Sequence, residues 1–245
     1  MQNIDPQRLQ SYRDLMDSLD PSGPPKVVYV SEPTVEHPRR PDRCLVLDAA
    51  FNPPTIAHWE LARAGARISE ADRILLQVSI SNVDKSVSGA DLGLRLYMVD
   101  RLAVDYDHVG VSACSHARFV DKAQALHDLS PSTRHIFAVG FDTLVRVFDP
   151  KYYSRMGSEL DDLFSTVEFA VANRGGQDEK ALTEYLAKPP QGNYKDNIHQ
   201  LTLAQNFRDI SSSETRDKIQ AGVDVSDRVS SIILDIIREA GLYSK

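Results

Sequence analysis

Residues 44–58 constrain the fold of this chain more than any other segment, because they indicate a strand, a turn and a helix in immediate succession. An apolar run at 44–47 has the composition of a buried strand. Two adjacent prolines then exclude helix and hold the chain extended. Thr55 follows as a helix N-cap, and residues 56–68 have helical composition. His58 therefore falls in the first turn of a helix, where backbone N–H groups and the positive end of the helix dipole attract phosphate. An ordinary strand–turn–helix with a surface histidine would share this pattern.

Strand and helix patterns alternate along the rest of the chain. Strands are expected at residues 44–49, 73–79, 109–113, 135–140, 168–172 and 198–203. Helices are expected at residues 56–68, 90–104, 120–128, 143–147, 159–164, 178–187, 212–220 and 225–240. Continuous apolar strands between amphipathic helices indicate a parallel sheet covered on both faces. The predicted fold class is α/β, a doubly wound Rossmann-like parallel sheet, whose ligands bind beyond the carboxyl ends of the strands.

The first 42 residues form a front segment with a pattern of its own. Residues 4–19 have helical apolar spacing, residues 27–30 read as a short strand, and the proline-rich stretch 32–43 reads as a loop. We expect residues 1–42 to be an N-terminal extension packed on one domain that spans residues 43–245.

Composition limits the classes of partner. The chain has 245 residues and a net charge of −7, which argues against a nucleic-acid-binding surface. Cys44 and Cys114 both lie in apolar runs and are expected to be buried thiols in a reducing compartment. No run is long enough to span a bilayer and no secretion signal precedes the domain, so we expect a soluble cytoplasmic or nuclear protein. The sequence leaves open whether it forms a homo-oligomer.

A second helix start follows at residues 210–216. Ser211 and Glu214 fit a capping box. Consecutive hydroxyls, the backbone N–H groups of the first turn and Arg216 one turn later would form a cradle for a triphosphate, because a guanidinium matches the geometry of phosphate oxygens. A box that only caps the helix would look the same.

Other polar residues also follow expected strands. The ammonium of Lys85 can follow a phosphoryl group through a reaction, although most single lysines are solvated. Gly140 permits close backbone approach, and Asp142 can accept both hydroxyls of a ribose or cap a helix that begins near Thr143.

Aromatic and cationic residues follow later in the chain. Tyr152 and Tyr153 are adjacent in a loop, where they can stack on a flat ring or cover the edge of the core. Arg174 precedes two glycines at the end of an expected strand, a pattern that a glycine turn with a solvated arginine shares.

Residues 51–58 resemble the (His/Thr)-x-x-His signature of nucleotidyltransferases. With matching segments from Lys85 to Arg216, the chain resembles the nicotinamide/nicotinate mononucleotide adenylyltransferases, in particular their fungal branch, over most of residues 43–240. The resemblance implies transfer of AMP from ATP to the mononucleotide, with release of pyrophosphate. It also implies Mg²⁺ bound with ATP, and the absence of a carboxylate cage in the sequence suits an ion held by phosphates and water.

The resemblance implies three groups of site residues. The catalytic group is His58, Lys85 and Arg216. The ATP-binding group is Ala50, Phe51, Thr55, His58, Gly140, Asp142, Ser211, Ser212, Ser213 and Arg216. The mononucleotide-binding group is Ala49, Asn52, Lys85, Tyr152, Tyr153 and Arg174.

Two departures from the family pattern keep alternatives open. Ala49 and Ala50 stand where the family usually has glycine and serine, so a hydroxyl is missing. The family tryptophan that stacks on nicotinamide has no counterpart at residues 114–119, and the only tryptophan, Trp59, adjoins His58. A catalytically weakened nucleotide-binding regulatory protein is one alternative. Adenylyl or cytidylyl transfer to another phosphate acceptor, such as phosphopantetheine, is another.

Overall fold

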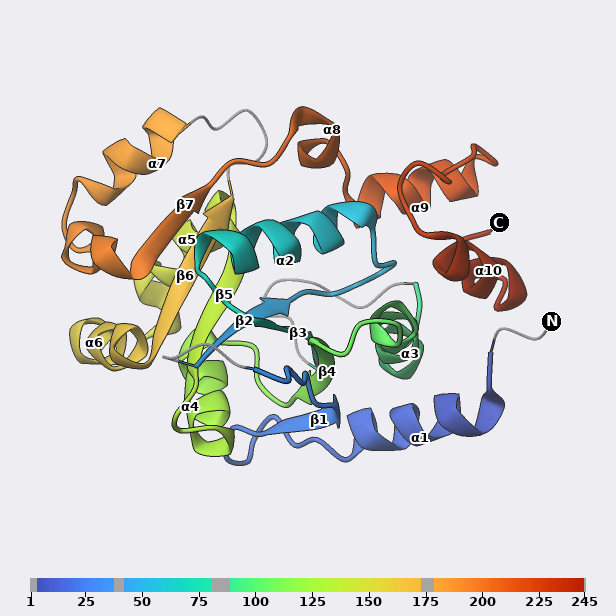
Figure 1. The fold of residues 1–245 in the computed structure, drawn as a ribbon, viewed down its shortest axis with the longest axis horizontal. Coiled ribbons are helices and arrows are strands. Elements are labelled where there is room, and N and C mark those ends of the chain that lie inside the picture. Colours follow the sequence, from blue (N-terminus) through green and yellow to red (C-terminus); the bar gives the residue numbers. More distant parts are fainter. Residues whose placement is uncertain (1–3, 38–41, 81–88, 173–178, 245) are drawn as a thin grey trace.

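A computed structural model describes residues 4–37, 42–80, 89–172 and 179–244. Within these ranges, seven strands form one sheet in the order β1-β4-β3-β2-β5-β6-β7 (Figure 1). They are β1 (Val27–Ser31), β2 (Arg43–Asp48), β3 (Arg73–Ser79), β4 (Val109–Cys114), β5 (Arg134–Gly140), β6 (Val167–Ala172) and β7 (Ile198–Leu201). Neighbouring strands from β4 to β7 are parallel, whereas β1 pairs antiparallel with β4. The predicted fold class is confirmed, with one antiparallel edge strand as the difference.

Helices connect the strands. They are α1 (Pro6–Asp17), α2 (Ile56–Ile68), α3 (Leu92–Ala103), α4 (Phe119–Leu129), α5 (Phe141–Val147), α6 (Met156–Thr166), α7 (Glu179–Leu186), α8 (Gln205–Arg208), α9 (Ser212–Gln220) and α10 (Ser231–Glu239), with 3₁₀ turns η1 (Pro150–Tyr152) and η2 (Gln191–Asn197). The bounds of α2, α9 and β3 are those predicted. None of the described helices has both the length and the apolar character to cross a membrane.

The last helix begins at Ser231, whereas the apolar spacing predicted a start at residue 225. The Arg228 carbonyl accepts a hydrogen bond from the backbone N–H of Ile56 at 2.9 Å, so it is directed away from a helical partner. The backbone N–H of Ser226 donates to Asp224 Oδ1 at 3.1 Å and forms a turn. Val225 is still buried, because the turn packs on the same core as the helix.

Strand β2 shows why both faces of the sheet are covered. Leu45 and Leu47 belong to one hydrophobic core, and Cys44 and Val46 belong to the other. Residues of α1, α2, α3 and α10 fill the first core, and residues of α4, α5, α6 and α7 fill the second. A continuous apolar strand is the expected consequence of burial on both faces.

The front segment shares the sheet and the first core. Helix α1 packs on α3, and β1 adds an edge strand beside β4. Leu9, Tyr12 and Met16 of α1 are buried in the same core as the strands that follow.

Both cysteines are buried free thiols, as predicted. Burial raises the pKa of Cys44 to about 12 and that of Cys114 to about 11. Both thiols therefore stay protonated and unreactive at neutral pH.

The strand order reverses at β2, and this reversal positions the site. The chain runs from β2 to β3 and β4 on one side, and β5, β6 and β7 lie on the other. Gly65 lets α2 lie close on the sheet, because a Cβ there would be 2.8 Å from Leu45 Cδ1 and 3.4 Å from Ala138 Cβ. Because α2 follows β2 in the chain, its start lies at the carboxyl edge of the sheet, where doubly wound folds bind their ligands.

Candidate active site

The turn between β2 and α2 is anchored by Phe51. Its φ of 44° lies in the left-handed region, which is uncommon for a bulky residue. The Phe51 side chain is 1% exposed, and its ring centroid lies 5.1 Å from that of His58. Burial of the ring offsets the backbone strain, so the main chain of the turn is held against the start of α2.

His58 is the third residue of α2 and is oriented by the helix N-cap. The backbone N–H of Thr55 donates to His58 Nδ1 at 3.1 Å, and Thr55 Oγ1 lies 2.7 Å from the same nitrogen. Because a backbone N–H can only donate, Nδ1 is the acceptor and Nε2 carries the proton of the neutral ring. Nε2 is therefore the ring nitrogen that can donate to a phosphoryl oxygen. Thr55, predicted to contact ATP, is buried and acts here on the histidine.

Helix α9 begins against the same turn. Ser212 Oγ donates to the Pro53 carbonyl at 2.8 Å, and Arg216 Nη1 donates to the Asn52 carbonyl at 2.7 Å. Figure 1 shows α9 beside the start of α2. The two helix N-termini that the sequence separates by more than 150 residues thus meet at one turn. This contact places Arg216 of the predicted polyphosphate cradle against the turn that precedes His58.

The cap of α9 differs in one detail from the predicted box. Ser211 Oγ accepts from the backbone N–H of Glu214 at 3.2 Å, which is one half of the box. The Glu214 carboxylate pairs with Arg228 Nη2 at 3.0 Å. Ser213 is exposed, and its hydroxyl lies 3.4 Å from Arg216 Nη2. Serine hydroxyls and the arginine fork therefore share the solvent side of this helix start.

A second arginine, Arg95 of α3, lies under the turn. It is 3% exposed, and its Nε donates to the Ala90 carbonyl at 2.8 Å while Nη1 lies 3.5 Å from the Ala50 carbonyl. Burial lowers the pKa of Arg95, and the positive charge of Arg216 lowers it further. Asp91, the N-cap of α3, pairs with Arg13 at 2.8 Å. Two guanidinium groups therefore make the potential around this turn positive, in a chain whose net charge is −7.

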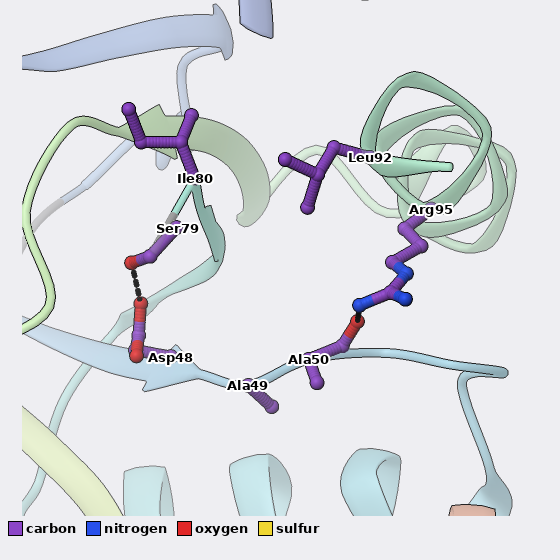
Figure 2. Close-up of a pocket in the computed structure, with 7 residues that line it drawn as sticks. All are labelled: Asp48, Ala49, Ala50, Ser79, Ile80, Leu92 and Arg95. Atoms are coloured by element: carbon purple, nitrogen blue, oxygen red, sulfur yellow. Dashed lines mark hydrogen bonds between the residues drawn. The ribbon is translucent and has the colours of Figure 1, made fainter. Parts of the chain in front are cut away.

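A small pocket opens beside the turn, between the carboxyl ends of β2 and β3 and the start of α3. It is lined by Asp48, Ala49, Ala50, Ser79, Ile80, Leu92 and Arg95. Figure 2 shows Leu92 and Arg95 across the pocket from the main chain of Asp48–Ala50, with Arg95 reaching the Ala50 carbonyl from α3. The lining of this pocket combines apolar side chains with one carboxylate and one guanidinium.

On the other side of β2, the end of β5 faces the same edge of the sheet. Val46 pairs with Phe137, and extending that register directs Gly140 to the edge where Ala49 lies. A Cβ built on Gly140 would meet no atom within 4 Å, so the backbone is open to close approach. Helix α5 begins at Phe141 with Gly140 as its N-cap, so the expectation that Asp142 caps a helix near Thr143 is wrong. The strand runs directly into the helix because Phe141 is buried, and this leaves Asp142 exposed in the first turn.

Comparisons with known proteins show which family the chain belongs to. The family model described as cytidylyltransferase-like matches residues 46–218. The chain belongs to the cytidylyltransferase-like family. It is 31% identical over 210 residues to a Schizosaccharomyces pombe protein named "Putative nicotinamide mononucleotide adenylyltransferase", covering 79% of this chain and 83% of that protein. The resemblance drawn from the sequence motifs is thereby confirmed.

Solved structures support the fold of this cytidylyltransferase-like chain. Plasmodium falciparum nicotinic acid mononucleotide adenylyltransferase complexed with NaAD superposes with a TM-score of 0.62 at 17% identity, covering 82% of this chain and 97% of the other. The same enzyme complexed with APC gives a TM-score of 0.60 at 16% identity, with the same shares of both chains. At this identity the likeness shows a common fold.

The two tyrosines of this cytidylyltransferase-like chain have partners in the protein. The Tyr153 hydroxyl donates to the Val147 carbonyl, and burial raises the pKa of this phenol. The Lys151 ammonium lies 4.7 Å from the centroid of the Tyr152 ring, and the Tyr152 carbonyl accepts from Arg118 Nη1 at 3.1 Å. These contacts support the core-edge interpretation for Tyr153, and a nicotinamide contact by either ring stays a prediction.

Three other residues were predicted to bind the mononucleotide. Asn52 is 6% exposed and its side chain holds the start of α3, because Oδ1 accepts from the backbone N–H of Ala90 at 3.2 Å. Lys85 and Arg174 lie outside the described residues. Their roles remain predictions from the sequence.

Sequence reasoning missed a buried ion pair beside the pocket. Lys122 of α4 donates from Nζ to Asp48 Oδ2 at 2.5 Å, and the two side chains are 4% and 13% exposed. Ser79 Oγ and Gln77 Nε2 donate to Asp48 Oδ1 at 2.5 and 3.2 Å. The detectable signal was a carboxylate at the end of an apolar strand, together with a lysine on the apolar face of a helix. Nothing in the local sequence pairs these two residues, which lie 74 positions apart.

Across the described part of the chain, no three His, Cys, Asp or Glu side chains gather in a group that could hold a metal ion.

Proposed function

We propose that this protein transfers AMP from ATP to nicotinamide or nicotinate mononucleotide, forming the dinucleotide and pyrophosphate. The observation that carries the proposal is the meeting of two helix N-termini at one turn, where Ser212 and Arg216 bond the carbonyls of Pro53 and Asn52. A paired helix start with a histidine and an arginine is a site for a polyanion. The S. pombe relative named for nicotinamide mononucleotide adenylyl transfer supports this choice of substrates.

The reaction needs no nucleophile from the protein. The phosphate of the mononucleotide attacks the α-phosphorus of ATP, the bond to the bridging oxygen breaks, and pyrophosphate leaves with the electron pair. The protein must bring two anions together in line and stabilise the charge that develops on the leaving group. Each positive group about 4 Å from a phosphate oxygen contributes about 4 kcal/mol at an effective dielectric constant of about 20. A few focused groups therefore supply much of the effect.

Each described residue has a role in this scheme. His58 donates from Nε2 to an oxygen of the α-phosphoryl group, since Thr55 occupies Nδ1. The backbone N–H groups and hydroxyls of Ser211–Ser213, with Arg216, hold the β- and γ-phosphates. Lys85 is proposed to assist there on the basis of its sequence position alone.

In this proposal the acceptor occupies the pocket and the ribose of ATP lies at the end of β5. The acceptor binds in the pocket between β2 and β3, where Arg95 attracts its phosphate and Ile80 and Leu92 offer apolar contact. The ATP ribose binds beside Gly140, where Asp142 is exposed and can accept its hydroxyls. The two substrates then approach each other over β2, at the reversal of strand order.

Mg²⁺ is proposed to enter with ATP, and the residues described here leave it to the phosphates and water. When bound, it would neutralise charge on the polyphosphate and on the departing pyrophosphate.

A discontinuous assay tests the proposal. Protein, ATP and Mg²⁺ are incubated with nicotinamide or nicotinate mononucleotide, and the dinucleotide is separated and quantified. Product from either acceptor, lost in His58→Ala, is the expected result. ATP binding without product would favour a regulatory nucleotide binder, and product only with CTP or phosphopantetheine would show a different transferase.

A further inference from the structure

The segment after α10 reaches back to the signature turn through Tyr243. Its hydroxyl lies 2.7 Å from Asn52 Oδ1, across 191 positions of sequence. Tyr243 has a φ of 61°, in the left-handed region, so the backbone adopts an uncommon conformation to direct the ring inward. The neighbouring Leu242 packs against the first core. This contact belongs to the tertiary structure and has no counterpart in the local sequence signal.

Asn52 joins several segments at once. Its Oδ1 accepts from the backbone N–H of Ala90 at 3.2 Å as well as from Tyr243. A backbone N–H can only donate, so the atom facing both groups is the amide oxygen and the tyrosine hydroxyl is the donor. The main-chain carbonyl of Asn52 accepts from Arg216 Nη1 at 2.7 Å. The side chain and backbone of one buried residue thus tie the start of α3 to the arginine of α9.

The packing around this junction leaves little room. Gly89 has a φ of +96°, and a Cβ there would lie 2.8 Å from Asn52 Oδ1 and 2.9 Å from Tyr243 Cε1. Only glycine satisfies both the conformation and the close approach. Movement of the tyrosine ring would therefore be transmitted to Asn52.

Burial keeps the Tyr243 hydroxyl protonated, so that it remains a donor. Burial raises the pKa of Tyr243 to about 12, although Arg95 and Arg216 both act to lower it. The phenol is accordingly protonated at neutral pH and can donate to Asn52 throughout the working range.

We propose that Tyr243 is a positioning residue of the polyphosphate site: its hydroxyl holds Asn52, and the Asn52 carbonyl holds the Arg216 guanidinium toward the phosphates. The inference rests on the proposed function in one respect, that Arg216 binds the β- and γ-phosphates. An arginine held in advance loses less conformational freedom on binding, so removal of the hydroxyl weakens polyphosphate binding without removing any group that touches it.

The experiment uses Tyr243→Phe, which removes the hydroxyl and keeps the ring, alongside Arg216→Ala and the double variant. Tyr194→Phe, which removes a hydroxyl that donates to Asp161 at 2.8 Å, is the matched control. The readouts are the KM for pyrophosphate and kcat in pyrophosphorolysis of the dinucleotide, and calorimetric affinity for inorganic tripolyphosphate. We expect Tyr243→Phe to raise the KM for pyrophosphate about tenfold with kcat changed much less, and to weaken tripolyphosphate binding by a similar factor.

The double variant separates positioning from a general loss of structure. In the Arg216→Ala background, Tyr243→Phe should add little, because the group it positions is absent. Kinetics like those of Tyr194→Phe, or a full additive effect in the double variant, would overturn the inference while leaving the proposed function intact. If the wild-type protein forms no dinucleotide, the proposed function fails. The tripolyphosphate affinities then still decide: weaker binding in Tyr243→Phe supports the positioning role, and equal binding refutes it.

Discussion

The buried pair of Lys122 and Asp48 allows a stability prediction whose size follows from the structure. The perturbation is Lys122→Met, which keeps the length of the side chain and removes its charge. Asp48 would then keep Gln77 and Ser79 as donors but lose its counter-charge, in a position where its side chain is 13% exposed. Breaking a buried ion pair costs about 3–5 kcal/mol. Because Asp48 keeps some exposure, we expect Lys122→Met to lower the free energy of unfolding by about 3 kcal/mol. A loss of that size lowers the Tm of a chain this long by about 6–12 °C.

A double-variant cycle makes the prediction sharper. Asp48→Asn leaves an ammonium that is 4% exposed, so its cost should be at least as large. The double variant Asp48→Asn with Lys122→Met leaves no unpaired charge, and we expect it to be within about 1 kcal/mol of the wild type. The assay is urea unfolding at pH 7, with the free energy of unfolding and the m-value fitted for each variant.

The matched control is Lys180→Met, in an exposed pair with Glu184 whose side chains are 79% and 63% exposed. Its expected cost is at most about 0.5 kcal/mol. The reasoning is refuted if Lys122→Met costs no more than this control, or if the double variant is less stable than both single variants.

Three further predictions concern the site and its pH range. His58→Ala should lower kcat about a hundredfold and change the KM for ATP much less, because the histidine is proposed to donate in the transition state. The control is His127→Ala, in the last turn of α4. Equal effects of His58→Ala on kcat and KM would show that His58 merely binds ATP. Arg216→Ala should slow pyrophosphorolysis by at least about tenfold, and an unchanged rate would remove Arg216 from the polyphosphate site. His135 is 1% exposed, and burial, with Arg73 nearby, lowers its pKa from 6.5 to about 4. As pH falls, His135 is protonated in the unfolded chain before it is protonated in the folded protein, so the free energy of unfolding falls by about 2 kcal/mol between pH 7 and pH 5. His135→Leu should lessen that pH dependence in urea unfolding. An unaltered pH dependence would contradict the lowered pKa of His135.

The predicted elements and the observed ones agree best where the signal is local. Helix α2 runs over the predicted residues 56–68 and α9 over residues 212–220, because an N-cap residue and an apolar period are both written into neighbouring residues. The start of α10 was misplaced because its boundary depends on Ile56, far away in sequence, which takes the Arg228 carbonyl. Helix α5 was placed too late because burial of Phe141 carries the strand straight into the helix.

The site divides in the same way. The signature turn and the serine–arginine helix start could be named from their residues, since each is a short segment with a physical affinity for phosphate. Only the structure shows how they approach each other, through the bonds from Ser212 and Arg216 to the turn. The partners in the Asp48–Lys122 pair and in the Tyr243–Asn52 contact could not be matched from sequence, because each contact joins residues that are far apart in the chain.

The sequence by itself determined the alternation of strands and helices and the parallel character of the main sheet, and it predicted which segments bind phosphate, because these depend on the chemistry of adjacent residues. The tertiary structure decided which segments meet: the antiparallel edge strand β1, the second arginine under the turn, and the tyrosine that reaches Asn52. The physical reason is that backbone propensity and periodicity act over a few residues. Contacts between side chains depend instead on how crossovers and packing bring distant parts of the chain together.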